Sequence, residues 1–344
     1  MNNIACDIII PVMDQLELTR NCLESIRHKT RGPYNVIVVD NNSSPVTGSF
    51  LKNFASNNKN FTIVNNNENL GWVRAVNQGI KLSKAPYVCV MNNDTIVETE
   101  DWLRKMIAVA DLEPGIGLVN PRFDIKNRTP RGVRFLEIDF CRGYCVLIKR
   151  PVIERIGSLD EAYGMGYYDD DDYSVRAIRA GFKCVRANDV VVRHLRDSTF
   201  SSVYSEAQRG KLHEANKKLF YSKWGKRLNI FFISTAGGDR RVRDLLVSLA
   251  RKQHVVYLRS SSSVGGRHIN IREKVLPKLL LGLLSSIGLA VNNGKSASKR
   301  YDLVFFDDAA LKASILKVRP DASFVDTGLD MARIDELVDA AARV

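Results

Sequence analysis

The residues best suited to chemistry in this 344-residue chain are four consecutive aspartates, Asp169 to Asp172. They directly follow Tyr167 and Tyr168, and an expected helix runs after them from Ser174 to Gly181. Carboxylates this close repel one another, so a folded domain must supply a cation, basic neighbours or water. Like charges and aromatic surroundings also raise a carboxylate's pKa, which suits a general base. The alternative is a solvated acidic turn at the helix start, where acidic residues are favoured.

Three further polar clusters come at the ends of predicted strands. Apolar, β-branched runs with the profile of buried parallel strands occur at residues 6–12, 34–39 and 87–91. The clusters that follow them are Asp14-Gln15, residues 40–44 (DNNSS) and residues 92–94 (NND). Ligands bind at the carboxyl ends of the strands in such sheets, so we expect the three clusters to line one binding edge.

The order of the expected elements indicates an α/β fold with two domains. Strands alternate with helices up to a long helix at 205–224, which is typical of a doubly wound sheet. Gly225 is a natural boundary, so we expect domains at 1–225 and 226–344. The second domain shows the same strand–helix alternation and is expected to be a small Rossmann-like unit.

The charge balance favours anionic partners. The formal net charge is +13, which suits nucleotide phosphates, nucleic acid or an anionic membrane surface. No zinc-binding or aromatic RNA-binding motif accompanies it, so we expect no nucleic-acid partner. The six cysteines include no Cys-x-x-Cys pair, which favours reduced thiols in a cytoplasmic protein. The N-terminus has no basic region followed by an apolar run, so no signal peptide is expected.

One apolar segment, residues 279–291 (LLLGLLSSIGLAV), tests the expectation of a protein without membrane spans. It is shorter than the roughly 20 residues that a spanning helix needs. We expect a buried core helix. The alternative is a helix on a membrane surface, giving peripheral contact at the inner face, with its basic flanks on anionic lipid. These flanking residues are Lys274, Lys278, Lys295, Lys299 and Arg300.

Five motifs occur in order between Asp7 and Trp224. They are Ile9-Ile10-Pro11 with Thr19, Leu23 and Ser25; residues 38–44 (VVDNNSS); Asn69-Leu70-Gly71-Trp72 with Asn77 and Gly79; residues 91–95 (MNNDT) with Trp102-Leu103; and Ile156-Gly157 with residues 159–161 (LDE) and the acidic run. This series resembles the family 2 glycosyltransferases, an inverting group with the GT-A fold. The C-terminal domain resembles, more weakly, the N-terminal half of a GT-B glycosyltransferase, and is either truncated or an accessory unit.

The resemblance implies an enzyme. It would transfer a sugar from a nucleotide-diphosphate donor to a hydroxyl of a glycan, lipid-linked or protein acceptor, as in surface polysaccharide biosynthesis. The family pattern places the general base at Asp170. Four aspartates in a row leave this alignment open by one residue, so Asp169 and Asp171 are the alternatives.

The resemblance also implies a divalent cation, Mn²⁺ or Mg²⁺, held by Asp94 and completed by His194. The alternatives are a turn or N-cap role for Asp94 and a structural role for His194. The family's loop often carries two aspartates, and Asn92 stands at the first position, which weakens metal affinity. The residues implied to bind the nucleotide-sugar are Pro11, Asp14, Asp40, Asn69, Gly71, Asn92, Asn93 and Asp94.

Two of these roles have competing explanations. Asp40 would accept a hydrogen bond from the donor's base or ribose, or else form an Asx-turn after its strand. Asn92 favours a different class of protein, a non-catalytic nucleotide-sugar-binding or scaffold module of a larger multi-transferase protein. Arg196 and Ser198 are further candidates for phosphate contact.

Overall fold

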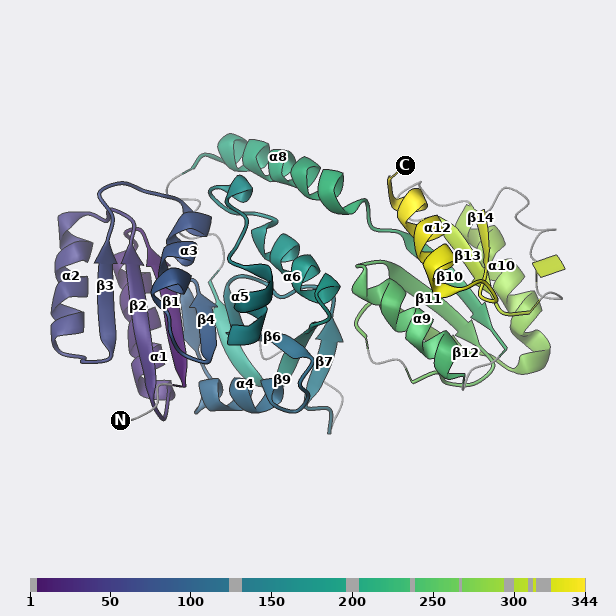
Figure 1. Ribbon diagram of the computed structural model, residues 1–344, viewed down its shortest axis with the longest axis horizontal. Helices are drawn as coiled ribbons and strands as arrows, with labels where there is room; N and C mark the ends of the chain where they lie inside the picture. Colours follow the sequence, from purple (N-terminus) through teal and green to yellow (C-terminus); the bar gives the residue numbers. More distant parts are fainter. Residues whose placement is uncertain are drawn as a thin grey trace. The chain divides into compact units, whose positions relative to one another are not determined.

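The computed structural model describes residues 5–123, 132–195, 204–235, 239–265, 268–293, 300–308, 312–313 and 323–343. The chain divides into two compact units, Met1–Leu219 and Phe220–Val344 (Figure 1). The division falls within helix α8 (Glu206–Trp224), whereas the sequence placed it just past the end of this helix, at Gly225. Arg196 and Ser198 lie outside the described residues.

The first unit is built on a mixed sheet with the strand order β3-β2-β1-β4-β8-β6-β9-β5, and β7 also pairs with β9. Its strands are β1 (Cys6–Val12), β2 (Tyr34–Asp40), β3 (Phe61–Asn65), β4 (Tyr87–Met91), β5 (Thr95–Val97), β6 (Ile116–Arg122), β7 (Phe135–Ile138), β8 (Cys145–Lys149) and β9 (Lys183–His194). Strands β1 to β4 are parallel, whereas β8 runs antiparallel to both β4 and β6. The doubly wound prediction therefore describes only the N-terminal half.

Helices cover both faces of this sheet. They are α1 (Leu16–Lys29), α2 (Pro45–Ser56), α3 (Trp72–Leu82), α4 (Trp102–Ala110), α5 (Arg150–Ile156), the short 3₁₀ helix η1 (Glu161–Tyr163) and α6 (Asp169–Arg179). Alternate residues of β1 point to opposite faces. Ile8 and Ile10 pack in the core with α1, α2 and α4, and Ile9 packs in the core with α3, α5 and α6. Because helices cover both faces of the sheet, its central strands consist almost entirely of apolar residues.

Three element boundaries differ from the sequence prediction for identifiable reasons. The sequence predicts a short helix at residues 50–55, but helix α2 begins at Pro45, because proline is favoured in the first turn of a helix. Helix α6 begins at Asp169 instead of Ser174, because acidic side chains favour the first turn. Apolar runs at residues 182–187 and 190–193 predict two strands, but the structure has one strand, β9, because its irregular pairing with β6 keeps the chain in the sheet.

The three strands that carry polar residues at their carboxyl ends are neighbours in the sheet, as the sequence predicts. Strand β1 pairs in parallel with β2 and with β4, so all three carboxyl ends meet at one edge of the sheet. Pairing with β2 extends to Val12 opposite Asp40, but pairing with β4 stops at Ile9 opposite Val90. Pro11 therefore lies beyond the last residue pair between β1 and β4. Its missing N–H removes no hydrogen bond between these two strands.

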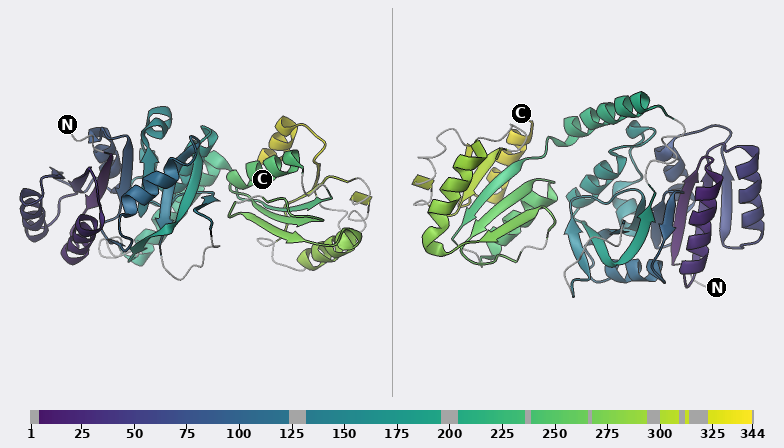
Figure 2. Two further views of the ribbon diagram at one scale, coloured as in Figure 1. Left: turned by 90° about the horizontal axis from the view of Figure 1, so that it is seen from below. Right: turned by 180° about the vertical axis from the view of Figure 1, so that it is seen from behind.

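The second unit is a five-stranded parallel sheet with the order β12-β11-β10-β13-β14. Its elements are β10 (Asn229–Ser234), α9 (Arg240–Arg251), β11 (Val255–Ser260), β12 (Ile271–Val275), η2 (Lys278–Leu280), α10 (Leu281–Asn293), β13 (Leu303–Phe306), β14 (Ser323–Asp326) and α12 (Met331–Arg343). Helices α9 and α12 pack on one face and α10 on the other (Figure 2). The Rossmann-like arrangement is as expected, with β12 as an additional edge strand.

The apolar segment is not the fully buried core helix that the sequence predicts. Leu281 and Leu289 of α10 are buried against the sheet, but Leu283 and Ile287 are exposed. None of the helices in the described ranges is long and apolar enough to span a membrane. All six cysteines belong to the described residues, and each is buried and free, as expected.

A pair of helical glycines tests how tightly α3 packs on the sheet. A Cβ at Gly79 would lie 2.4 Å from Cγ2 of Ile9, whereas one at Gly210 in α8 would meet nothing within 4 Å. We expect Gly79→Ala to destabilise the first unit by about 1–3 kcal/mol, because overpacking outweighs the gain in helix propensity. Gly210→Ala, the matched control, should stabilise by up to about 1 kcal/mol. Urea unfolding measures both, and equal midpoints for the two variants would contradict this packing.

Candidate active site

The four aspartates form the first turn of α6, preceded by Tyr168 in the left-handed conformation (φ 65°). Successive residues of a helix are rotated by about 100°, so the four carboxylates point in four directions. Each one meets a different set of partners. The ambiguity left by the sequence is thus a question of which direction each side chain takes.

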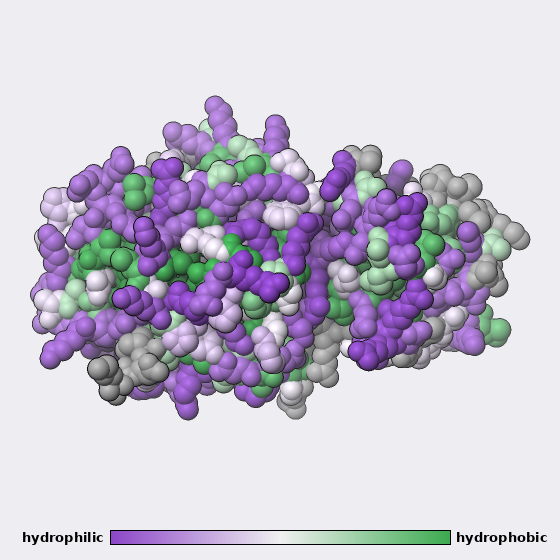
Figure 3. Space-filling model, viewed as in Figure 1, coloured by the Kyte–Doolittle hydropathy of each residue, from purple (hydrophilic) through white to green (hydrophobic). Residues whose placement is uncertain are grey.

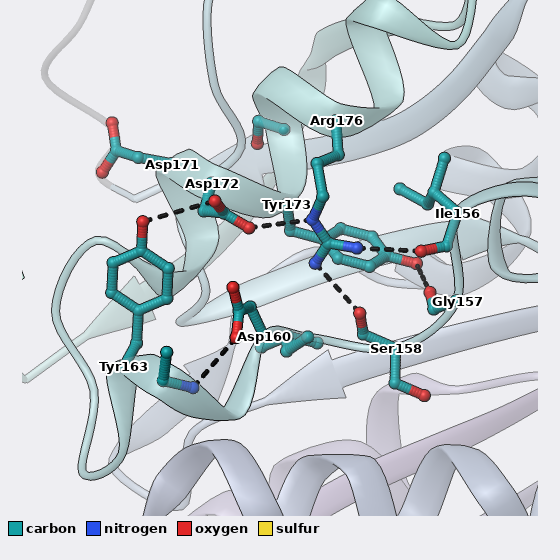
Figure 4. A network of polar contacts seen from close by, with 12 residues as sticks. Ile156, Gly157, Ser158, Asp160, Tyr163, Asp171, Asp172, Tyr173 and Arg176 are labelled. Atoms are coloured by element: carbon teal, nitrogen blue, oxygen red, sulfur yellow. Dashed lines mark hydrogen bonds and ion pairs between the residues drawn. The ribbon is translucent and has the colours of Figure 1, made fainter. Parts of the chain in front are cut away.

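Asp172 is committed to holding the helix in place. It is almost fully buried, and its carboxylate accepts hydrogen bonds from Arg176 Nε at 2.8 Å and from the Tyr163 hydroxyl at 3.3 Å (Figure 4). The same guanidinium donates to the backbone carbonyls of Ile156 and Ser158, both at 2.9 Å. These contacts tie α6 to the end of α5, so Asp172 is a structural brace.

Asp169 is buried and directed at Trp72, whose indole Nε1 donates to Oδ2 at 3.1 Å. Burial, together with the neighbouring charge of Asp170, raises the pKa of Asp169 to about 8. Asp169 and Asp170 both line a small pocket whose other walls are mostly apolar and include Leu118 and Tyr173. The scarcity of polar neighbours is the physical cause of the desolvation.

Asp170 is held by two backbone donors. Gly143 N–H donates to Oδ2 at 2.8 Å, and Asp171 N–H donates to Oδ1 at 3.0 Å. Burial raises the pKa of Asp170, and these hydrogen bonds oppose the increase. Burial and the charge of Asp170 also raise the pKa of Asp171, whose side chain points away from the Asp172–Arg176 contacts in Figure 4.

A second cluster forms where β5 pairs with the end of β9. The backbone N–H of Leu195 donates to the Asp94 carbonyl at 3.0 Å, which places His194 beside Asp94. His194 Nε2 lies 3.2 Å from Asp94 Oδ1 and 3.2 Å from the side-chain amide nitrogen of Asn92. The imidazole stacks on the ring of Tyr144, with centroids 5.1 Å apart and an interplanar angle of 13°. Packing therefore fixes the orientation of this ring.

Two consecutive residues, Gly143 and Tyr144, join the clusters. The Tyr144 carbonyl accepts from Asn92 N–H at 2.9 Å, and the Tyr144 ring supports His194. Gly143 N–H holds Asp170 on the other side. The Asp94–His194 pair and the Asp170 carboxylate are thereby brought to neighbouring positions, although 76 residues separate Asp94 from Asp170.

The loops after β1 and β2 are joined by side-chain hydrogen bonds. Asp14 accepts from Ser44 N–H at 2.8 Å, and its own N–H donates to Ser43 Oγ at 2.9 Å. The hydrogen bonds from Ser44 lower the pKa of Asp14. Buried Asp40 accepts from Ser43 N–H at 2.9 Å, three residues along the chain, whereas an Asx-turn would use the N–H two residues along.

The Asn69–Gly71 turn packs directly on the loop that leads into α6. Asn69 Oδ1 accepts from Gly71 N–H at 2.9 Å, and Asn69 Nδ2 lies 2.9 Å from Met13 Sδ. Gly71 has φ +82°, and a Cβ there would come within 2.6 Å of Met165 Sδ. Only glycine suits this conformation and this close approach. The turn thus connects the loop after β1 with the loop before α6.

Not every predicted residue joins the two clusters. Asn93 is buried and donates through Nδ2 to Thr19 Oγ1 at 2.9 Å, which anchors the loop to α1. Pro11 is buried within β1 and contributes no polar group. The cluster at the end of β9 therefore consists of Asn92, Asp94 and His194.

The Asp94–His194 pair fits a divalent cation in part. A carboxylate oxygen and an imidazole nitrogen converge at 3.2 Å, and both are competent ligands for Mn²⁺. Within the described ranges no three His, Cys, Asp or Glu side chains gather in a way that could hold a metal ion. Cations that bind nucleotide phosphates commonly take only one or two protein carboxylates, and the phosphates supply other ligands.

The sequence profile of Glycosyl transferase family 2 matches residues 7–157. This region is a family 2 glycosyltransferase domain. The family expectation is confirmed for it, and the profile ends before the acidic run of α6.

Curated relatives of this domain include the glycosyltransferase AglE of Haloferax volcanii. It is 24% identical over 202 residues, which cover 54% of this chain and 66% of the relative. The poly-beta-1,6-N-acetyl-D-glucosamine synthase of Staphylococcus aureus is 25% identical over 169 residues, covering 46% of this chain and 40% of the relative. The chain thus spans less than two thirds of either protein.

The fold is also found among solved glycosyltransferases. GalNAc-T7, crystallised with UDP, GalNAc and Mn²⁺, superposes with a TM-score of 0.50 at 13% identity, over 56% of this chain and 44% of that one. This similarity concerns the fold alone, and it confirms the GT-A expectation for the glycosyltransferase domain.

Several residues that position the two clusters carry no sequence signal for an individual role. Trp72 belongs to one of the five motifs, but the motif does not predict its hydrogen bond to Asp169. Gly143 and Tyr144 precede a strand and carry no motif. Asn216 of α8 donates through Nδ2 to the carbonyls of the 163–168 loop, and a single asparagine in a polar helix gives no signal.

The raised pKa of Asp169 predicts a pH-dependent stability. A carboxyl group whose folded pKa exceeds its unfolded value binds its proton more tightly when folded. Its contribution is therefore present below about pH 4 and is lost as pH rises towards about 8. Asp169→Asn stays neutral, so we expect it to exceed wild type in unfolding free energy by more than about 1 kcal/mol at pH 8. Denaturant titrations should show this difference shrinking towards pH 4. The exposed control Asp189→Asn should show no such trend, and a difference that is constant with pH would refute the assignment.

Removing the Asn216 side chain should loosen the loop before the aspartates. Its Nδ2 lies 2.9 Å from the Tyr163 carbonyl, 2.7 Å from that of Gly166 and 3.2 Å from that of Tyr167. We expect Asn216→Ala to cost about 1–3 kcal/mol, because buried carbonyls lose their donor. Hydrogen exchange should quicken at residues 163–172. Lys218→Ala, an exposed change on the same helix, is the control, and equal exchange in both variants would contradict this role.

Proposed function

We propose that this chain is an inverting glycosyltransferase that moves a sugar from a nucleotide-diphosphate donor to a hydroxyl group of an acceptor. The observation that carries the proposal is the junction at residues 143–144. There Asp94 lies beside His194, and a half-buried carboxylate, Asp170, is held on the other side. Inversion needs a base on the face of the sugar opposite the leaving diphosphate. In this arrangement Asp170 would act as the base, and Asp94 with His194 would lie towards the diphosphate.

Asp170 is the base in this proposal. Asp169 is engaged by Trp72, and Asp172 by Arg176 and Tyr163. Two backbone N–H groups orient the Asp170 carboxylate, and burial raises its pKa towards the range where a carboxylate accepts a hydroxyl proton efficiently. Asp171 is the alternative, but the Gly143 N–H donates to Asp170 and not to Asp171.

Asp94 and His194 would hold Mn²⁺ or Mg²⁺. When bound, the cation neutralises charge on the diphosphate of the donor. The chain itself orients the pair, since Tyr144 supports the imidazole and the β5–β9 pairing sets the carboxylate. The amide of Asn92 is at the same distance from His194 and would offer its oxygen after rotation.

The joined loops after β1 and β2 would receive the nucleotide. Asp14 and Asp40 use hydrogen bonds to Ser43 and Ser44 to shape these loops, and Asn69 with Gly71 closes the neighbouring turn. One carboxylate oxygen of Asp40 accepts from Ser43 N–H, and the other would be offered to a base or ribose hydroxyl. UDP in GalNAc-T7 is a precedent for such a ligand in this fold.

The acceptor in this proposal is a glycan, a lipid-linked sugar or a protein, in a pathway of surface polysaccharide formation. The named activity of the staphylococcal relative, a polysaccharide synthase, supports the glycan class. Six buried free thiols agree with a reducing compartment such as the cytoplasm. The second unit has a single five-stranded Rossmann-like sheet, and we propose an accessory role for it.

A second candidate, nucleotide-sugar binding without turnover, is favoured by Asn92, which replaces an acidic metal ligand with a neutral amide. The two proposals are separated by one measurement. Wild-type protein is incubated with UDP-, GDP- and dTDP-sugars in the presence of Mn²⁺ or Mg²⁺. Calorimetry reports binding, and donor hydrolysis or transfer reports turnover. Binding with turnover supports the enzyme, binding alone supports the second candidate, and no binding of any donor excludes both.

Single substitutions then assign the roles. Asp170→Asn should lower turnover by at least about 100-fold while donor affinity changes little, because only proton acceptance is lost. Asp94→Ala should weaken donor binding in the presence of Mn²⁺ and abolish its dependence on the cation. Asp189→Asn, an exposed change of the same type, should leave both unchanged. If Asp171→Asn is inactive and Asp170→Asn active, the base is Asp171. The anomeric configuration of the product, read by NMR, tests inversion.

A further inference from the structure

Helix α10 of the second unit has two apolar faces, and only one packs against protein. Leu281, Ser285 and Leu289 follow one another at intervals of four residues and are fully buried. The two leucines pack with Phe231 and Ile233 of the central strand β10. This face accounts for the position of the helix on the sheet.

The opposite face is apolar and exposed. Leu279 is 94% exposed, Leu283 60% and Ile287 50%, and Leu280 and Leu284 beside them are also exposed. Val275 and Pro277, just before η2, extend this surface. We call these seven residues the α10 apolar face. In Figure 3 the surface is mainly hydrophilic, and hydrophobic residues show at the edge of the second unit where Figure 1 draws the start of α10.

The sequence that carries the α10 apolar face is basic. Residues 271–300 contain six Lys or Arg and one Glu, a net charge of 6 − 1 = +5. The single acid, Glu273, accepts hydrogen bonds from Ser263 Oγ at 3.1 Å and Val264 N–H at 2.7 Å. Residues 274–293 contain no Asp or Glu at all. Lys274 and Lys278 are exposed directly beside the exposed leucines.

We infer that the α10 apolar face docks on the surface of an anionic lipid bilayer. Thirteen residues of helix span about 20 Å, too short to cross the hydrocarbon core, so α10 would lie in the plane of the interface. The leucines would enter the boundary between headgroups and acyl chains, and the lysines would contact the anionic headgroups. A purely apolar partner would contact the leucines and leave the lysines unused. The net charge of +5 in the sequence of residues 271–300, with exposed Lys274 and Lys278 beside the leucines, favours the lipid. This inference does not depend on the proposed transfer reaction.

Vesicle flotation with the full chain tests the inference. Vesicles contain phosphatidylcholine alone or with about one third phosphatidylglycerol, and we expect at least about tenfold stronger binding to the anionic vesicles. The triple variant Leu279→Ser/Leu283→Ser/Ile287→Ser should reduce this binding at least about tenfold, because the inserted side chains are lost. Val46→Ser/Leu82→Ser, at exposed positions of the first unit, is the matched control and should bind like wild type.

Charge is tested in the same way. Lys274→Glu/Lys278→Glu should lower binding to anionic vesicles at least about tenfold, whereas Lys52→Glu/Lys59→Glu, with the same change in net charge, should have a much smaller effect. All substituted positions are exposed, so circular dichroism and melting should match wild type. Absence of vesicle binding, or equal losses in test and control variants, would overturn the inference. A wild-type dimer in solution that the leucine variant dissociates, without vesicle binding, would instead assign the face to a second copy.

Discussion

Four carboxylates in a single helical turn cannot share one environment, and the first unit is arranged around separating them. Rotation about α6 sends Asp169 to an indole, Asp170 to a backbone N–H and Asp172 to a guanidinium. The mutual repulsion of four neighbouring carboxylates would oppose folding. It is reduced here because each carboxylate lies in different surroundings. Asp172 becomes a brace, and burial raises the pKa values of the other three carboxyl groups.

This division depends on segments that hold the start of α6 from outside. Asn216 binds the carbonyls of the loop before the helix, and Gly71 approaches the same loop so closely that no side chain fits between. Residues 143–144 then set the position of Asp170 relative to His194. The proposed base and the proposed cation ligands are therefore positioned by the same piece of backbone, and a shift of that piece would move both.

In the second unit, one apolar segment, helix α10, has one face buried against the sheet and the other face exposed. A segment of 13 apolar and small residues, 279–291, suggests a core helix, but a helix on the outside of a three-layer unit has only one inward face. The remaining leucines stay at the surface, beside lysines. Composition alone cannot separate a helix buried all round from a helix buried on one side, because both have the same apolar content.

The sequence by itself determined the strands β1, β2 and β4, the parallel edge where Asp14, Asp40 and Asp94 gather, and the family of the domain. Each of these follows from local patterns, namely apolar runs, their polar ends and ordered motifs. Helix α6 could have been placed correctly from the preference of acidic side chains for a first turn. Tertiary structure alone decided the directions of the four aspartates, the pairing of Asp94 with His194 and the exposure of α10. These depend on contacts between residues such as Trp72 and Asp169, which are 97 positions apart, and no local pattern encodes such contacts.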